Sequence, residues 1–186
     1  MLGQGDHQFK TEIALLSKYK HENIVSLLGF CDEEGEKILV YKFESNGSLD
    51  RHLNNKDLIN LDTTTVDLPR CCLWVKHWKA KISDFGLSKV RPANMQASFL
   101  FSKPGGTEGY IDPDYGNNGY LTQKSDVSSF GVVLWEVLCG RLTVDPSYND
   151  ERRCLTVLAK MHYRKKTLNL IIPSGFIQRD KQRFIT

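Results

Sequence analysis

Apolar residues recur at helical spacing in two stretches of the chain. Between residues 9 and 16 they follow at intervals of four and three, which predicts an amphipathic helix, with Asp6 as a candidate N-cap. From 124 to 138 they leave little polar face, which is typical of a buried helix. Gly140 follows that stretch as a candidate left-handed C-cap, and a further helix is expected over 152–162.

Strand patterns are confined to the first half of the chain. Runs of β-branched and aromatic residues at 24–30 and 38–41 predict two strands. The acidic stretch 32–36 separates them, so we expect an antiparallel hairpin. A brief strand is expected at 81–82. Between 54 and 80 neither period is present, and we expect irregular structure there.

Composition narrows the class of protein. Of the 186 residues, 40% are hydrophobic and 25% are charged, which is ordinary for a globular domain and excludes a disordered or fibrous chain. The apolar run that begins at Phe130 stops at Glu136, well short of the roughly 20 residues that a membrane span needs. The five cysteines are an odd number without C-x-x-C spacing, which argues against a disulfide framework or a zinc site.

The two ends of the chain add expectations about location and partners. The first ten residues hold no basic segment followed by an apolar one, so no secretory signal is expected and the default compartment is cytosolic. The segment 141–186 carries ten Lys and Arg against four Asp and Glu. We interpret this excess as solvated helix faces and expect no nucleic-acid partner.

Three short blocks occur in a fixed order in the second half of the chain. They are Asp84-Phe85-Gly86, the stretch 106–115 with Gly-Thr-Glu-Gly-Tyr at its start, and the stretch 124–133 with Lys-Ser-Asp-Val. Together they resemble the receptor-like and Pelle-type protein kinases of plants. Upstream, 21–25 resembles the turn between helix C and strand 4 of that family, and 39–49 resembles its hinge. The resemblance extends from about residue 3 to 172, with a break in the middle.

The resemblance implies an α+β chain with a partial bilobal kinase fold. Residues 1–44 would be a remnant N-lobe with helix C, strands 4 and 5 and the hinge. Residues 45–186 would be a partial, mostly helical C-lobe. Within it lie the irregular segment 54–80, the activation segment 84–115 and helix F at 124–138.

Site residues follow from the resemblance position by position, with ATP and Mg²⁺ as the cofactors. Asp84 would hold Mg²⁺ on the ATP phosphates, a role that suits a hard oxygen ligand. Glu12 would be the helix C glutamate; because its lysine partner would lie before Met1, we expect a solvated carboxylate here. Backbone groups of the hinge would bind adenine, and these hinge residues are Tyr41, Lys42, Phe43 and Glu44.

Other residues are assigned to the C-lobe in the same way. Thr107 would lie in the substrate-docking loop. Asp126 stands in the first turn of helix F, where its charge would complement the helix dipole. Asp114 replaces the glutamate that the family has at the end of the activation segment.

The catalytic loop is where the chain departs most from the family. No H-R-D sequence occurs, and Asp67, which lies 17 positions before Asp84, is the only candidate for a relic of the base. Cys72 stands where the family has an asparagine for the second Mg²⁺. About fifteen residues separate His52 from Asp67, too few for the long helix E that supports this loop. The glycine-rich loop and its lysine would lie before Met1.

Three interpretations of function follow. Intact relatives would transfer the ATP γ-phosphoryl group to protein Ser or Thr, and we expect this chain, as written, to do so no faster than background. Alternatively, it is a non-catalytic, pseudokinase-like interaction module, or the product of a faulty gene model, which the unusual segment 62–76 favours. The expected partners are a protein substrate or a receptor complex, at the cytoplasmic face of the plasma membrane or in the cytosol.

Overall fold

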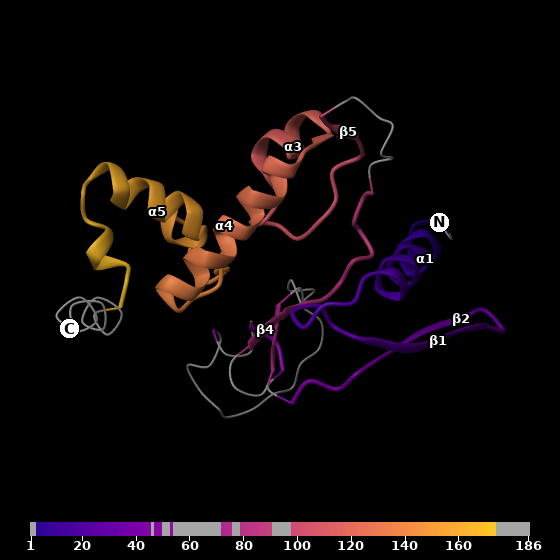
Figure 1. Cartoon of the computed structure of the whole chain (residues 1–186). Helices are drawn as coiled ribbons and strands as arrows, with labels where there is room; N and C mark the ends of the chain where they lie inside the picture. The colour runs from indigo at the N-terminus through magenta and orange to yellow at the C-terminus, as the bar shows by residue number, and fades with distance from the viewer. Residues whose placement is uncertain are drawn as a thin grey trace. The chain divides into compact units, whose positions relative to one another are not determined.

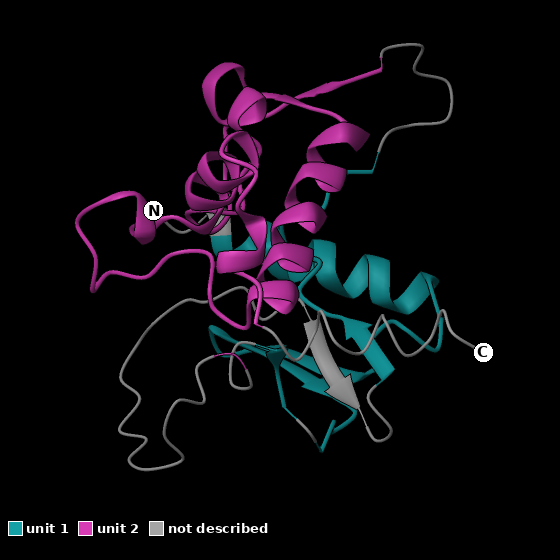
Figure 2. Ribbon diagram, turned by 90° about the vertical axis from the view of Figure 1, so that its left-hand side faces the viewer, with its two compact units in different colours: residues 1–52, 61–95 teal, residues 53–60, 96–186 magenta. Residues whose placement is uncertain are grey.

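The structure is a computed structural model, and it describes residues 3–45, 47–49, 53, 72–75, 79–90 and 98–173 (Figure 1). The chain is α+β, as the sequence predicts. It forms two compact units, which Figure 2 distinguishes by colour: unit 1 is Met1–His52 with Leu61–Met95, and unit 2 is Leu53–Asn60 with Gln96–Thr186. Within the described residues no helix is long and apolar enough to cross a membrane.

Unit 1 begins with the helix α1, Gly3–Lys18, which confirms the first predicted helix. Its apolar positions Phe9 and Leu16 are 8% and 1% exposed. The Phe9 ring meets Phe30 edge to face, with 6.2 Å between ring centroids. The helix is therefore held by an apolar stripe that packs on the neighbouring strand, as amphipathic helices are.

The predicted N-cap role of Asp6 is wrong, because the helix already begins at Gly3 and Asp6 lies inside its first turn. There the carboxylate pairs with Lys10 at 2.7 Å and with Lys37 at 2.9 Å. Hydrogen bonds from these two ammonium groups lower the pKa of Asp6 from 3.8 to about 2. Asp6 therefore joins α1 to the following hairpin.

The predicted hairpin is confirmed. Strands β1, Leu27–Glu33, and β2, Glu36–Tyr41, pair antiparallel around a turn at Glu34 and Gly35, both of which have positive φ. The first strand begins later than the pattern predicts. Ile24 instead makes an isolated parallel bridge with Ile82.

A second pair of strands carries the segment that precedes the Asp-Phe-Gly sequence. Strand β3, Cys72–Val75, pairs antiparallel with β4, Lys79–Ile82. β4 confirms the expected brief strand, whereas β3 contradicts the expectation of irregular structure at 72–75. Pairing with β4 supplies the backbone partners that the local sequence pattern does not reveal. The rest of 54–80 lies outside the described residues, apart from 79–80 in β4.

Unit 2 is mostly helical. Its longest helix is α4, Gln123–Cys139, and the expected helix at 152–162 is present as a 3₁₀ turn, η2, followed by α5. The remaining bounds are β5 Leu100–Phe101, α3 Pro113–Asn118, β6 Tyr120–Leu121, η2 Glu151–Arg153, α5 Leu155–Arg164 and η3 Leu168–Leu170. β5 and β6 pair antiparallel.

The helix α4 confirms the second predicted helix and both of its ends are capped. The Thr122 hydroxyl accepts from the Ser125 backbone N–H, and the Ser125 hydroxyl accepts from the Thr122 N–H, which forms a capping box. Gly140 ends the helix with φ of 63° and donates its N–H to the Glu136 carbonyl, as its predicted C-cap role requires.

One face of this helix is exposed, although its sequence pattern is typical of a buried helix. Four apolar side chains form a stripe at intervals of three and four, and they are Val127, Phe130, Leu134 and Leu138, with exposed fractions of 70%, 59%, 47% and 38%. The opposite face is buried and includes Val132 and Glu136. The described residues thus cover one side of α4 only.

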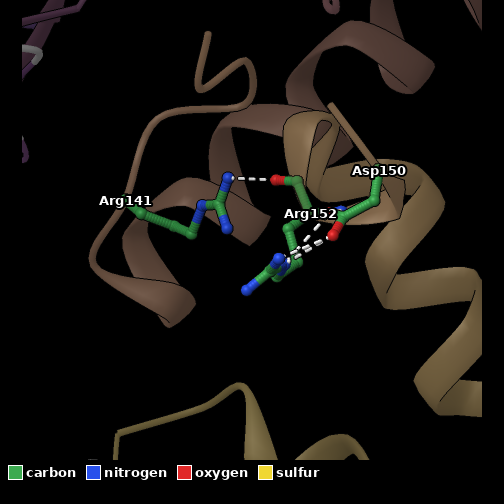
Figure 3. A network of polar contacts seen from close by, with 3 residues as sticks. All are labelled: Arg141, Asp150 and Arg152. Carbon is green, nitrogen blue, oxygen red and sulfur yellow. Dashed lines mark hydrogen bonds and ion pairs between the residues drawn. The ribbon is translucent and has the colours of Figure 1, made fainter. Parts of the chain in front are cut away.

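A polar network orders the loop between α4 and α5 (Figure 3). Arg141 donates to the Arg152 carbonyl at 2.6 Å, and the Arg152 guanidinium pairs with the Asp150 carboxylate at 2.6 Å. Both guanidinium groups lie over the Tyr148 ring, at 5.9 Å and 4.5 Å from its centroid. Hydrogen bonds from Arg152 lower the pKa of Asp150. Because the pair is exposed, its contribution to stability is small, and it acts mainly by ordering the loop.

Replacement of Thr122 by alanine removes the side-chain half of the capping box. We expect Thr122→Ala to lower the free energy of unfolding of unit 2 by about 1 kcal/mol. Urea unfolding followed by far-UV circular dichroism measures the change. Thr122→Asp keeps a side-chain oxygen at the cap and serves as the control; equal loss in both variants would contradict a role for the cap.

Candidate functional site

The Asp-Phe-Gly sequence leaves β4 in a tight turn against α1. Asp84 has φ of 63°, a left-handed conformation that aspartate tolerates better than most residues, and its side chain is exposed. Gly86 is buried. A Cβ atom at Gly86 would lie 3.1 Å from the Gln8 Cβ and 3.5 Å from the Glu12 Oε2. The absence of a side chain at 86 therefore lets the turn approach the helix backbone closely.

Glu12 lies beneath that turn, and it is 6% exposed. The Tyr41 hydroxyl donates to its Oε1 at 2.5 Å. The expectation of a solvated carboxylate is therefore wrong: burial would leave the charge without water, and a hydroxyl at the end of β2 supplies a donor in its place. Burial, then the hydrogen bond to Glu12 and the charges of Glu12 and Asp84, raise the pKa of Tyr41 well above its ordinary value of 10.0.

The segment predicted as the hinge follows β2 directly. The Lys42 N–H donates to the Ser26 carbonyl at 2.8 Å, which ties the start of the segment to the chain ahead of β1. Phe43 is 85% exposed. In contrast to Phe43, the Glu44 side chain is buried, and its carboxylate pairs with the Lys81 ammonium at 2.7 Å.

Some of the residues that the resemblance implies for a nucleotide site lie close together in the structure. Glu12, Tyr41 and Gly86 meet at one side of α1, and the charge of Asp84 acts on Tyr41. Glu44 is linked to the strand that leads to Asp84. Sequence patterns missed the Tyr41–Glu12 and Lys81–Glu44 contacts, because each joins elements far apart in the chain. Asp67 lies outside the described residues, as does the side chain of Cys72.

Asp84 offers a single exposed carboxylate, which is compatible with Mg²⁺. The described parts of the chain contain no group of three or more His, Cys, Asp or Glu side chains arranged for a metal ion. Mg²⁺ is commonly held by one or two carboxylates together with substrate phosphates and water. An exposed carboxylate at the end of a strand satisfies that requirement, whereas it would be insufficient for a structural zinc or calcium ion.

Unit 2 holds a second cluster, around a buried carboxylate of α4. Glu136 is 2% exposed. Its Oε1 accepts from the Tyr110 hydroxyl at 2.5 Å and from the Thr143 N–H at 2.7 Å. The Ser129 hydroxyl donates to the Tyr110 carbonyl at 2.7 Å. These bonds fix the loop at 106–110 on the helix.

The loop itself depends on a glycine. Gly109 has φ of 89°, and a Cβ there would lie 2.8 Å from the Thr143 Cγ2 and 2.7 Å from the Val144 Cγ2. The Thr107 carbonyl accepts from the Tyr110 N–H at 3.2 Å, so Thr107 opens the turn that places the tyrosine. Its part in peptide docking stays a prediction. Asp126 and Asp114 are exposed in the first turns of α4 and α3.

Comparison with known proteins decides the family. The family model described as protein tyrosine and serine/threonine kinase matches residues 3–73 and 67–169. The chain belongs to the protein kinase family. Three similar curated proteins of Arabidopsis thaliana are receptor-like protein kinases: ANXUR2 is 39% identical over 91% of this chain, ANXUR1 is 38% identical over 91%, and FERONIA is 35% identical over 92%.

The match covers most of this chain but only a minor part of each relative. The chain spans about a quarter of the length of these curated relatives, 23% of ANXUR2 and 22% of FERONIA. The ANXUR2 alignment extends over 199 positions but takes in 91% of 186 residues, about 169, so about 30 positions of the relative have no counterpart here. The two kinase-model segments overlap at 67–73, within the stretch between the hinge and Asp84.

Tyr41, at the end of β2, makes the free energy of unfolding depend on pH in the alkaline range. At neutral pH we expect Tyr41→Phe to lower the free energy of unfolding by about 1–3 kcal/mol, because the variant removes a donor from the buried Glu12. Above pH 10 Tyr41 loses its proton in the unfolded chain and keeps it in the folded chain. The free energy of unfolding of the unchanged chain therefore falls as pH rises. Tyr41→Phe has no phenol to titrate, so it lacks this contribution to the fall.

Urea unfolding about one pH unit below and above 10 measures that difference, which should narrow as pH rises. Tyr19→Phe, at a residue that is 47% exposed, is the matched control. A gap between Tyr41→Phe and the unchanged chain that stays constant across this interval would contradict the interpretation.

The loop at 106–110 gives a separate test. We expect Gly109→Ala to destabilise unit 2 by about 1–3 kcal/mol, through both the positive φ and the contacts with Thr143 and Val144. Gly131→Ala in α4, where a Cβ meets no atom within 4 Å, is the control and should be neutral or stabilising. Thermal unfolding compares the two, and an equal response would show that the loop tolerates a side chain at 109.

Proposed function

We propose that this chain is a nucleotide-binding domain of the receptor-like kinase type in which phosphoryl transfer is lost or reduced to background. The observation that carries the proposal is the packing of Gly86 on Gln8 and Glu12. It places the Asp-Phe-Gly turn against α1 with the Asp84 carboxylate exposed at the end of β4. A carboxylate in that position is suited to bind Mg²⁺ with a nucleotide.

The roles of the residues follow from this arrangement. Asp84 would hold Mg²⁺, and the backbone of Tyr41, Lys42, Phe43 and Glu44 would bind adenine. Mg²⁺ on ATP neutralises charge on the phosphates. Glu12, which is bonded to the Tyr41 hydroxyl, would hold α1 at a fixed distance from the end of β2 rather than remain free in solvent. The loop at 106–110 would present a peptide, supported by Tyr110 on Glu136.

The sequence of this chain lacks a part that phosphoryl transfer requires. The sequence between the hinge and Asp84 contains no H-R-D, and Asp67 is the only carboxylate at the spacing of a base. Over the whole alignment, about 30 positions of a kinase relative have no counterpart in this chain. The two segments of the family match meet and overlap at 67–73, between the hinge and Asp84. A general base contributes typically about 10²–10⁴ in rate, so its loss alone would take a kinase far below its usual turnover.

Location and partners are proposed from the relatives. Because the similar proteins are receptor-like protein kinases, we propose that this domain acts on the cytoplasmic side of the plasma membrane. Its partner would be a protein substrate or a member of a receptor complex. The same division of the family match at 67–73 favours one rival, a chain produced by a faulty gene model. Sequencing of the transcript across the codons for 54–80 tests whether the gene model is faulty.

A binding experiment tests the proposed function. We expect a fluorescent ADP analogue to bind the 186-residue chain in the presence of Mg²⁺, and Asp84→Asn to weaken that binding by at least about tenfold. In EDTA the two proteins should bind alike, because the carboxylate then has no ion to hold. Asp114→Asn, at an exposed aspartate of α3, is the control.

A parallel assay with radiolabelled ATP and a general protein substrate tests activity. We expect transfer at least about 10²-fold below the 1–100 s⁻¹ of ordinary kinases. Turnover within the ordinary range would overturn the proposed inactivity. Absence of nucleotide binding by the unchanged chain would overturn the nucleotide site and favour a non-catalytic interaction module.

A further inference from the structure

One ion pair of unit 1 differs from the others in its burial. The Lys81 ammonium lies 2.7 Å from the Glu44 carboxylate, and the two side chains are 14% and 6% exposed. In every other ion pair between described residues, both side chains are at least 32% exposed. The free energy of such a pair depends on its surroundings, because removal from water costs about as much as the attraction returns.

The position of the pair indicates what it does. Lys81 is the third residue of β4 and stands three positions before Asp84, whereas Glu44 belongs to the segment that follows β2. The pair therefore joins two segments that are 37 positions apart in the chain. The neighbouring Lys42 N–H is bonded to Ser26, so the segment is held at both of these points.

We propose that Lys81 is a positioning residue for nucleotide recognition, which acts through the carboxylate of Glu44. The ion pair fixes the backbone at 42–45 relative to β4, and with it the distance between the adenine-binding backbone and the carboxylate of Asp84. This inference rests on the proposed function for the identity of the ligand. Lys81 is not a catalytic residue, because its ammonium is engaged with Glu44.

A second lysine of β4, Lys79, can be compared with Lys81. Lys79, two residues earlier on β4, pairs with Glu22 at 3.3 Å, and these side chains are 65% and 70% exposed. An exposed pair of this kind contributes little. Lys79→Met therefore removes the same type of charge from the same strand without loss of a buried bond, and it is the matched control for Lys81→Met.

The experiment combines hydrogen exchange with nucleotide binding on the 186-residue chain. For Lys81→Met we expect the amide of Lys42 and its neighbours up to 45 to exchange at least about tenfold faster, because opening of the segment becomes easier. We expect the affinity for ADP with Mg²⁺ to fall by about tenfold or more. Glu44→Gln, which keeps an acceptor at 44, should show a smaller change of the same sign.

The double variant Glu44→Lys with Lys81→Glu restores the pair with its charges exchanged. We expect it to recover most of the protection and affinity that Lys81→Met loses, while Lys79→Met matches the unchanged chain. A residue with a merely structural role would shift the melting temperature but leave ADP affinity unaltered at temperatures well below the melt.

The outcomes separate this inference from the proposed function. If Lys81→Met leaves the exchange of 42–45 unchanged, the positioning role is overturned whether or not ADP binds. If exchange rises while the ADP affinity of Lys81→Met equals that of the unchanged chain, the nucleotide role is overturned. If the unchanged chain does not bind ADP, the proposed function fails, and faster exchange in Lys81→Met would then support the link between the two segments alone.

Discussion

A buried carboxylate needs a hydrogen-bond donor, and that requirement organises both units of this chain. Glu12 in unit 1 and Glu136 in unit 2 are 6% and 2% exposed, and each accepts a tyrosine hydroxyl at 2.5 Å. An ionised carboxylate without water or a donor would cost several kcal/mol. Each tyrosine is therefore constrained to one place, and the loop or strand that carries it is constrained as well. In unit 1 the result is a fixed spacing between β2 and α1.

Local order was predictable from the sequence to a useful extent. The apolar spacing from 9 to 16, the two β-branched runs and the stretch from 124 to 138 each appear as the expected element, because the signal lies within the element itself. The cap at Gly140 follows for the same reason. Asp6 shows the limit of this approach: helix termini depend on backbone bonds of the preceding residues, so an acidic residue one turn inside the helix resembles a cap.

The contacts of the candidate site could not be predicted from a single sequence. The sequence around Asp84 predicts its role but not the contacts near it. The engagement of Glu12 depends on a hydroxyl 29 positions away, and that of Glu44 on a lysine 37 positions away. Such pairings are set by how the elements pack. The exposed stripe of α4 shows the converse, since the pattern at 124–138 correctly indicates a helix suited to burial, while the covering side chains must come from elsewhere in the sequence.

The hydrogen bond between Tyr41 and Glu12 has a consequence for covalent modification. Tyr41 is 36% exposed as a residue, yet its phenolic oxygen is directed at a buried carboxylate. Phosphorylation would bring about one and a half to two further negative charges against that carboxylate. The repulsion would push α1 away from β2. The phenol is thus a poor phosphate acceptor while unit 1 is folded, and a phosphate found on it would indicate that this part of the chain had opened.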